Sequence, residues 1–195
     1  DLRNLLASSQ LLSDQLASVP DPRVQRFAPK LLRSLERAIA FCQSTLSYGR
    51  AQEAAPDRRV IMVEPAVAEV RESAGLATDV SITWISAIER GLTIDADPDQ
   101  LFRVLLNLVR NATQALETRQ DSDGGAQQIR ITGRREGTVA IIEVSDTGPG
   151  VPAKAREHLF EAFQTSGRPG GSGLGLAIAA ELIRAHGGHI HLVEG

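Results

Sequence analysis

Apolar side chains recur at helical spacing through the first fifty residues. Leucines from Leu2 to Leu16 lie three or four positions apart, or at multiples of these spacings, which predicts an amphipathic helix. The sequence Val19-Pro20-Asp21-Pro22 ends it, because proline lacks an N–H donor and clashes with the preceding turn. A second helix is predicted from about Arg23 to about Gln52, with a heptad-like stripe at positions 24, 27, 31, 35, 38, 42 and 46.

These two helices, joined by a short proline-bearing loop, predict an αα-hairpin over residues 1–53. One hairpin cannot bury its apolar stripe on both sides. Pairing with a second copy would complete a four-helix bundle, so we expect a homodimer through the hairpin. The alternative is that the stripe packs only on the domain that follows.

The pattern changes after a linker predicted over residues 54–58. Strands are expected over residues 59–63, 80–85, 92–95, 128–134 and 138–145, and again near the end of the chain from His189. Helices are expected over residues 65–74, 97–116, 153–163 and 174–185. This order predicts an α+β fold for residues 59–195, an α/β sandwich in which helices cover one mixed sheet. We expect both ends of the chain to lie inside longer elements, so that this domain is truncated at its C-terminus.

Composition and charge narrow the function classes. The chain of 195 residues has 42% hydrophobic and 23% charged residues and a formal net charge of -3, which is typical of a soluble globular protein and disfavours nucleic-acid binding. Cys42 is the single cysteine, so a disulfide framework and a multi-cysteine metal site are excluded. No apolar stretch approaches the ~18 residues of a membrane span, and no signal peptide opens the chain. We therefore expect a cytoplasmic segment without membrane contact, with membrane anchoring left open for a longer parent protein.

Asn107 and Asn111 lie at i and i+4 of the predicted helix over residues 97–116 and so share one face. Beside the apolar side of that helix, their amide oxygens are suitable ligands for a hard cation such as Mg²⁺. The alternative is a pair of solvated asparagines on a surface helix.

Asp146-Thr147-Gly148-Pro149-Gly150 follows a predicted strand. A carboxylate at a strand end can accept a hydrogen bond from an exocyclic amine, and the two glycines allow the backbone to approach a flat ring. The same five residues are also good chemistry for an ordinary turn.

Glycines at positions 170, 171, 173 and 175 run directly into the apolar helix that begins near Leu174. Glycines before a helix N-terminus expose backbone N–H groups, and the helix dipole favours anions there. The segment is neither a Walker loop nor a dinucleotide-binding fingerprint. A flexible linker is the alternative, although linkers rarely lead so directly into an apolar helix.

Taken together, Asn-x-x-x-Asn, Asp-x-Gly-x-Gly and Gly-x-Gly-x-Gly resemble, in this order and spacing, the N, G1 and G2 boxes of the ATP-binding fold shared by histidine kinases, gyrase and MutL. Leu159-Phe160-Glu161-Ala162-Phe163 resembles the kinase F box, and Asp1 to Ala7 resembles the H box. Asp97-Pro98-Asp99-Gln100 and the stretch Asn111 to Leu116 are most similar to the nitrogen-regulatory subgroup of sensor histidine kinases.

The resemblance implies a role for each matching residue. Asn111, and secondarily Asn107, would hold Mg²⁺ against the triphosphate of ATP, and Asp146 would accept from the adenine amine. Asp1 would be the acidic neighbour of the phosphoacceptor histidine and a candidate general base. The remaining implied ATP-binding residues shape the base pocket, wrap the phosphates, or form and anchor the lid: Gly148, Gly150, Phe160, Phe163, Arg168, Gly171, Gly173, Leu174 and Gly175.

This sequence departs from the family pattern at three places. The phosphoacceptor histidine is expected just before Asp1 and is absent here, and none of the four histidines present is followed by an acidic residue. The predicted lid, residues 164–170, is short, and its one cation, Arg168, either contacts the γ-phosphate or is solvated. The Gly-x-x-Phe ending of the family's usual third glycine box is absent, because the sequence stops before it.

The resemblance implies phosphoryl transfer from Mg·ATP to a histidine of the parent protein, and then to an aspartate on the receiver domain of a response regulator that docks on the hairpin. One alternative is an ATPase related to gyrase or MutL. Those enzymes place a water-activating glutamate four residues before the metal-binding asparagine, where this chain has Asn107, and an amide cannot take a proton. The other alternative is a phosphotransfer scaffold with a non-functional ATP site.

Overall fold

A computed structural model describes residue 24 and residues 55–77, 81–117, 125–162 and 173–193. The chain divides into two compact units, residues 1–50 and 51–195. Apart from Val24, which is helical, the described residues belong to the second unit. The predicted hairpin and its homodimer contact therefore lie outside the described residues and stay predictions.

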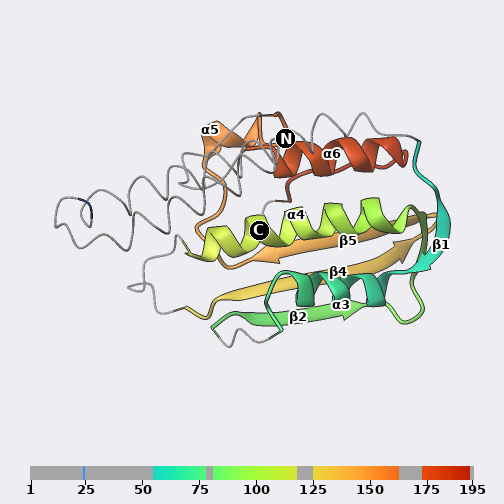
Figure 1. Ribbon diagram of the computed structural model, residues 1–195, viewed down its shortest axis with the longest axis horizontal. Helices are drawn as coiled ribbons and strands as arrows, with labels where there is room; N and C mark the ends of the chain where they lie inside the picture. Colours follow the sequence, from blue (N-terminus) through green and yellow to red (C-terminus); the bar gives the residue numbers. More distant parts are fainter. Residues whose placement is uncertain (1–23, 25–54, 78–80, 118–124, 163–172, 194–195) are drawn as a thin grey trace. The chain divides into compact units, whose positions relative to one another are not determined.

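A three-stranded mixed sheet is the framework of the second unit (Figure 1). Its strands lie in the order β2 (Thr83–Ile88), β4 (Gln128–Glu136) and β5 (Val139–Asp146). β2 runs parallel to β4, and β4 runs antiparallel to β5. The strands expected over residues 128–134 and 138–145 are β4 and β5, which form a β-hairpin with Gly137 at a positive φ of 59° in its turn. The mixed sheet confirms the predicted α+β class.

Two further strands form a separate antiparallel ladder. β1 (Arg59–Met62) pairs with β3 (Thr93–Ala96), with Arg59 opposite Ala96 and Met62 opposite Thr93. The end of β4 lies beside this ladder, because the Arg135 side chain donates to the carbonyl oxygen of Thr93. The predicted sandwich therefore contains a small ladder in addition to the mixed sheet.

Among the described residues of the second unit, four helices accompany the strands: α3 (Val63–Ser73), α4 (Pro98–Glu117), α5 (Ala153–Arg156) and α6 (Gly175–Ala185). α4 contacts β4, β5 and α3, and α6 packs on α4 (Figure 1). Along β4, Ile129 and Ile131 are fully buried whereas Arg130 between them is exposed, so one face of this strand points into the core. The main core also takes large side chains from α3 and α4, namely Val63, Val67, Val70, Leu101, Leu105, Val109 and Leu116.

α4 begins where its sequence predicts, at Asp97-Pro98. The Asp97 Oδ1 atom accepts hydrogen bonds from the backbone N–H groups of Asp99, at 3.0 Å, and Gln100, at 3.1 Å. These two groups have no partner inside the helix, so Asp97 is a true N-cap, and Pro98 follows at the position where a missing N–H costs nothing.

Three predicted elements differ from the structure. The strand expected over residues 80–85 is β2, from Thr83 to Ile88, because its length is set by the parallel register with β4, from Gln128 to Gly133. The helix expected over residues 153–163 ends at Arg156. Beyond it the backbone bonds Leu159 N–H to Arg156 and Glu161 N–H to His158 join residues three apart, which forms turns instead of an α-helix.

The predicted last strand is wrong for the described residues 188–193, none of which is in a strand. Alternating apolar residues give a segment the composition of a strand, but only a ladder with a neighbouring strand makes it one.

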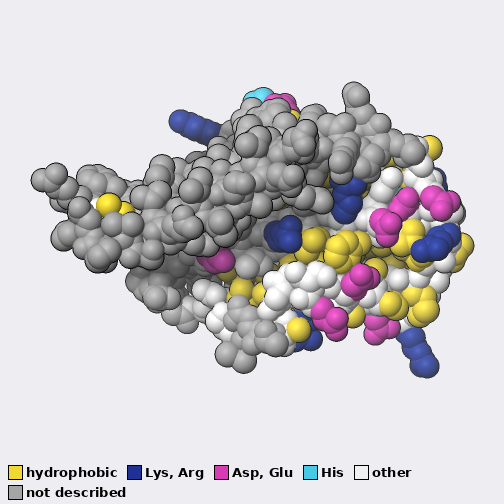
Figure 2. Space-filling view, in the orientation of Figure 1, with side chains coloured by type: hydrophobic (Ala, Val, Ile, Leu, Met, Phe, Trp, Pro, Cys, Tyr) yellow, Lys and Arg dark blue, Asp and Glu magenta, His cyan; other side chains and the backbone are white. Residues whose placement is uncertain are grey.

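The surface of the described residues mixes charged and apolar side chains, as Figure 2 shows for one face. The exposed large hydrophobic residues include Val60, Met62 and Val139. No helix in the described part of the chain combines the length and the hydropathy of a membrane span.

Candidate nucleotide-binding site

One face of α4 carries three site positions in a line. Asn107, Asn111 and Ala115 are spaced four residues apart, so they lie about one turn, ~6 Å, from one another along the same side of the helix. The two asparagines are half-buried and Ala115 is buried. The loop that contains Gly148 contacts this line at Ala115, and the N-terminus of α6 contacts it at Asn107.

Gly148 packs against the Ala115 end of the line. A Cβ atom added to Gly148 would lie 3.0 Å from the Cβ of Ala115 and 2.6 Å from Oδ1 of Asp146. Both distances are shorter than an ordinary carbon contact of ~3.5–4.0 Å or a carbon–oxygen contact. Glycine is therefore required here by close approach of the loop to α4, and not by its backbone angles.

Asp146 stands at the end of β5, at the start of the same loop. Its Oδ1 accepts a hydrogen bond from the backbone N–H of Gly148, at 2.8 Å, which orients the carboxylate. The side chain is exposed, so it remains accessible to a ligand. Gly150, further along the loop, has a positive φ of 73°.

Thr147 fixes this loop to the beginning of β4. Its hydroxyl donates to the carbonyl oxygen of Ala126, at 2.9 Å, and accepts from the backbone N–H of Gln128, at 3.0 Å. Its own N–H donates to the carbonyl oxygen of Gln128. Thr147 was not predicted as a site residue, because its hydrogen-bond partners, Ala126 and Gln128, lie about twenty residues away along the chain. A threonine inside an Asp-x-Gly-x-Gly motif is the signal that would have identified it.

The N-terminus of α6 meets the other end of the line. A Cβ added to Gly175 would lie 3.7 Å from the Asn107 Oδ1 atom, an ordinary contact distance. Gly173 precedes it with a positive φ of 67°. Leu174 is completely buried and its carbonyl accepts from Ile178, so it anchors the helix start in the interior instead of offering a side chain to a ligand.

Asn111 therefore lies on α4 between the position that contacts the Asp146 loop and the position that contacts α6. The Gly173–Gly175 segment brings a helix N-terminus, which favours anions, to within contact of Asn107. The amide oxygens of Asn107 and Asn111 are of the hard type that Mg²⁺ prefers. The donor set thus fits a metal-bound polyphosphate at one end and a ligand with an exposed amine at the other.

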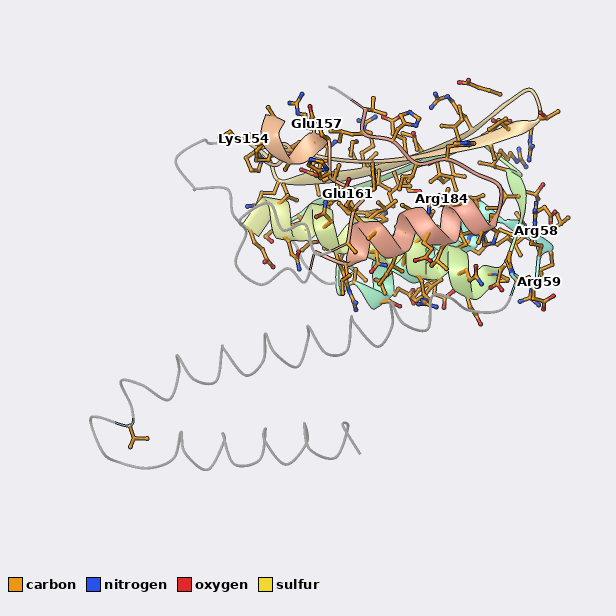
Figure 3. All side chains as sticks on the ribbon, turned by 90° about the horizontal axis from the view of Figure 1, so that it is seen from above. Arg58, Arg59, Lys154, Glu157, Glu161 and Arg184 are labelled. Carbon is orange, nitrogen blue, oxygen red and sulfur yellow. The ribbon has the colours of Figure 1, made fainter. Side chains whose placement is uncertain are left out.

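Along the chain, α5 and the turns after it lie between the loop that contains Gly148 and Gly150 and the Gly173–Gly175 segment. Phe160 is half-buried there. A hydrogen bond to Glu161, at 2.9 Å, and the charge of that carboxylate raise the pKa of His158. Figure 3 shows Lys154, Glu157 and Glu161 toward one end of α6, with Arg58 at the other end.

The remaining predicted site residues, Asp1, Phe163, Arg168 and Gly171, lie outside the described part of the chain.

A sequence profile described as "Histidine kinase-, DNA gyrase B-, and HSP90-like ATPase" matches residues 96–195, just over half of the chain. The chain belongs to this ATPase family. Within the family, the sensory histidine kinase/phosphatase NtrB of Escherichia coli O157:H7 is 44% identical over 106 residues, which is 50% of this chain and 29% of NtrB. The NtrB of Proteus hauseri is 31% identical over 203 residues, covering 99% of this chain and 55% of the relative.

Solved structures of histidine kinases share the fold of this ATPase-family chain. Full-length ShkA in complex with AMPPNP matches with a TM-score of 0.69 and 27% identity, covering 95% of this chain and 39% of ShkA. ThkA in complex with the response regulator TrrA matches with a TM-score of 0.64 and 20% identity, covering 94% of this chain and 51% of that one. The predicted resemblance to a sensor histidine kinase catalytic core with nitrogen-regulatory relatives is confirmed. The chain spans about half, or less, of the length of these relatives.

Proposed function

We propose that this chain binds Mg·ATP between the Asp146 loop and the N-terminus of α6, as the catalytic core of a protein-histidine kinase. The observation that carries the proposal is the line of residues on α4, in which Ala115 contacts Gly148 and Asn107 contacts Gly175. Three motifs that are distant along the chain thereby adjoin one helix face. The AMPPNP complex of ShkA and the histidine kinase names of the relatives support the same ligand and reaction.

Asp146 is the residue that reads the base. Its Oδ1 is already oriented by Gly148, and its exposed carboxylate accepts from the exocyclic amine of adenine. The absence of a side chain at Gly148 lets the loop stay close to α4 and leaves room for a flat ring. Gly150 supplies the sharp change of backbone direction after it.

Asn111, with Asn107 as the secondary ligand, holds Mg²⁺, whose charge neutralises the phosphate oxygens when it is bound. The backbone N–H groups at Gly173 and Gly175 and the dipole of α6 face the phosphates. Gly171 and Arg168 complete this phosphate contact, and Phe160 and Phe163 anchor the lid. These groups position the nucleotide, which is the larger part of catalysis in phosphoryl transfer.

In the parent protein the γ-phosphoryl group passes to a histidine expected just before Asp1, with Asp1 as general base, and then to an aspartate on a response-regulator receiver domain. The bond between the γ-phosphorus and its bridging oxygen breaks, leaving ADP, and a phosphorus–nitrogen bond forms. The ThkA–TrrA complex supports a response regulator as partner. Asn107 occupies the position where hydrolysis of ATP would need a water-activating glutamate. This residue therefore favours phosphoryl transfer to histidine over transfer to water.

The proposed organisation follows the same division. Residues 1–53 form the hairpin that serves dimerisation and histidine phosphotransfer, with the phosphoacceptor histidine just before Asp1. Residues 54–58 form a linker, and residues 59–195 form the ATP-binding domain. The chain acts in the cytoplasm, without contact to nucleic acid or membrane.

A radiolabel experiment tests the reaction. The chain of 195 residues should bind Mg·ATP but show no stable label from γ-labelled ATP, whereas a chain extended upstream by several helical turns, with histidine before Asp1, should be labelled. The label should be lost in acid and kept in base, as expected of a phosphoramidate. Stoichiometric labelling of His158, His186, His189 or His191 in the unextended chain would contradict the assignment of the acceptor.

A further inference from the structure

His186 joins the C-terminal end of α6 to the beginning of α4. Its Nε2 accepts a hydrogen bond from the backbone N–H of Asp97, at 3.0 Å, and its Nδ1 lies 2.8 Å from the carbonyl oxygen of Leu182. A carbonyl oxygen can only accept, so Nδ1 carries the proton and Nε2 presents a lone pair. Both hydrogen bonds can exist together only when the ring is neutral.

This bond lies at the opposite end of the α4–α6 interface from the nucleotide site. Gly175, at the start of α6, contacts Asn107, whereas His186, just past the end of α6, bonds to Asp97, just before α4. The two helices are therefore antiparallel. Between the two contacts α6 rises about 16 Å and α4 about 15 Å, at 1.5 Å per residue. The Gly175–Asn107 contact and the His186–Asp97 hydrogen bond thus lie at the two ends of the interface between α4 and α6.

Three of the five buried residues of α6 are alanines. The buried residues of α6 are Ala177, Ile178, Ala179, Ala180 and Leu182. Alanine side chains interdigitate little, and packed helices respond to perturbation by shifts of about 1–2 Å. The hydrogen bond between His186 and Asp97 is directional, and it lies at the C-terminal end of α6. It therefore restricts sliding of α6 along α4, and so the position of Gly175 relative to Asn107.

The charge of Asp97 interacts with that of His186, and both carboxylate oxygens of Asp97 accept hydrogen bonds from backbone N–H groups. Oδ1 of Asp97 accepts from two N–H groups of α4, and Oδ2 accepts from the N–H of Asp57, at 3.0 Å. Burial raises the pKa of Asp97, but the hydrogen bonds from Gln100, Asp57 and Asp99 outweigh it and, with His186, lower the pKa below its ordinary value of 3.8.

Two arginines, Arg58 and Arg184, lie at the C-terminal end of α6. Arg58 donates to the carbonyl oxygen of His186, at 3.4 Å, and pairs with Asp95 at 3.0 Å. Arg184 lies on the last turn of α6 itself, and Figure 3 shows it and Arg58 toward this end of the helix. The charged residues linked to this contact are thus Asp97 at the start of α4, Asp57 and Arg58 before β1, and Asp95 on β3.

We propose that His186 is a positioning residue for nucleotide binding, which holds the phosphate-facing end of α6 in place through the neutral ring. The inference rests on the proposed function of the site. Protonation of Nε2 replaces the acceptor of Asp97 N–H by a donor, so two donors face each other and the contact opens. Mg·ATP affinity should therefore be lower at pH 5.5 than at pH 8. The expected fall is about five- to tenfold, near the lower end of coupling between two sites.

A set of matched variants separates this effect from the titration of ATP itself. In His186→Gln, the neutral amide offers one acceptor and one donor at about the spacing of the ring nitrogens. It should bind Mg·ATP like the wild type at pH 8 and lose less affinity than the wild type at pH 5.5, because only the titration of ATP itself then weakens binding. His186→Phe lacks both groups and should bind weakly at every pH. His189→Gln, at an exposed position three residues away, should retain the wild-type pH profile.

Calorimetric titration of the 195-residue chain with Mg·ATP gives the affinities. Hydrogen exchange of the Asp97 amide, relative to its intrinsic rate and without nucleotide, gives a readout that needs no binding. Its protection should fall on acidification in the wild type and in His189→Gln but not in His186→Gln. Equal pH slopes in all variants together with unchanged Asp97 protection would overturn the inference. Wild-type protein that binds no ATP at pH 8 would instead refute the proposed function, while the exchange measurement would still decide whether the ring senses pH.

Discussion

Replacement of Gly148 by alanine tests the close contact between the Asp146 loop and α4. The added Cβ would lie 2.6 Å from Oδ1 of Asp146, 3.0 Å from the Cβ of Ala115 and 3.3 Å from its carbonyl carbon. The Ala115 backbone belongs to a helix and cannot yield, so the carboxylate and the loop must move. This displacement breaks the hydrogen bond from Gly148 N–H to Asp146.

The magnitude follows from two contributions. Overpacking of a well-packed site costs ~1–3 kcal/mol, and the lost hydrogen bond costs a net ~0.5–1.5 kcal/mol. We therefore expect a total of ~1.5–4.5 kcal/mol, divided between unfolding free energy and binding. Each ~1.4 kcal/mol of lost binding weakens Mg·ATP affinity about tenfold. Urea denaturation measures the first part and nucleotide titration the second.

The control is a double-mutant cycle with Ala115→Gly, which removes the opposing Cβ. That change alone costs ~1 kcal/mol of helix stability, yet combined with Gly148→Ala it should recover at least ~1 kcal/mol of the loss. Gly150→Ala provides a second comparison, because its cost comes from a positive φ of 73° and an added Cβ there meets nothing within 4 Å. Additive effects of Gly148→Ala and Ala115→Gly would refute the reasoning.

Three further changes test the remaining assignments. Asn111→Ala should abolish Mg²⁺-dependent ATP binding while the fold is kept, whereas the exposed neighbour change Arg110→Ala should not; unchanged calorimetric affinity in the first would exclude Asn111 as a ligand. Asp146→Ala should reduce the preference for ATP over GTP by ~1–3 kcal/mol, and a wild-type ratio would show that Asp146 does not read the base. Asp97→Ala should lower the unfolding free energy by ~1 kcal/mol at pH 7 through loss of the N-cap. Because the folded-state pKa of Asp97 is lowered, this difference should be full above pH 3.8 and shrink as pH falls below it; a constant difference in urea titrations would contradict the cap assignment.

Local chemistry made several elements predictable from the sequence. Asp97-Pro98 is a cap followed by a helix-compatible proline, so α4 begins as expected. Gly137 allows the tight turn of the β4–β5 hairpin. The asparagine spacing depends only on helix geometry, and it placed Asn107 and Asn111 on one face without knowledge of the rest of the fold.

Features that depend on distant partners were not predictable. The bounds of β2 follow from its register with β4, and the role of Thr147 follows from Ala126 and Gln128. The short contact of Gly148 with Ala115 joins a loop to a helix that an entire strand pair separates in the sequence. The bond between His186 and Asp97 spans 89 residues, and an isolated histidine at a helix end gives no sign of its partner.

The parallel pairing of β2 with β4 has a consequence for folding kinetics. Parallel strands need a crossover connection, and α4 is part of the chain between these two strands. The helix that bears the proposed nucleotide site is thus also inside the longest loop that this sheet must close, and closing such loops slows folding. Nascent chains would acquire binding competence only after β4 has been synthesised and paired. A nucleotide that binds only the completed fold would then stabilise the folded state by mass action. This lowers the population of reopened chains and their exposure to proteases.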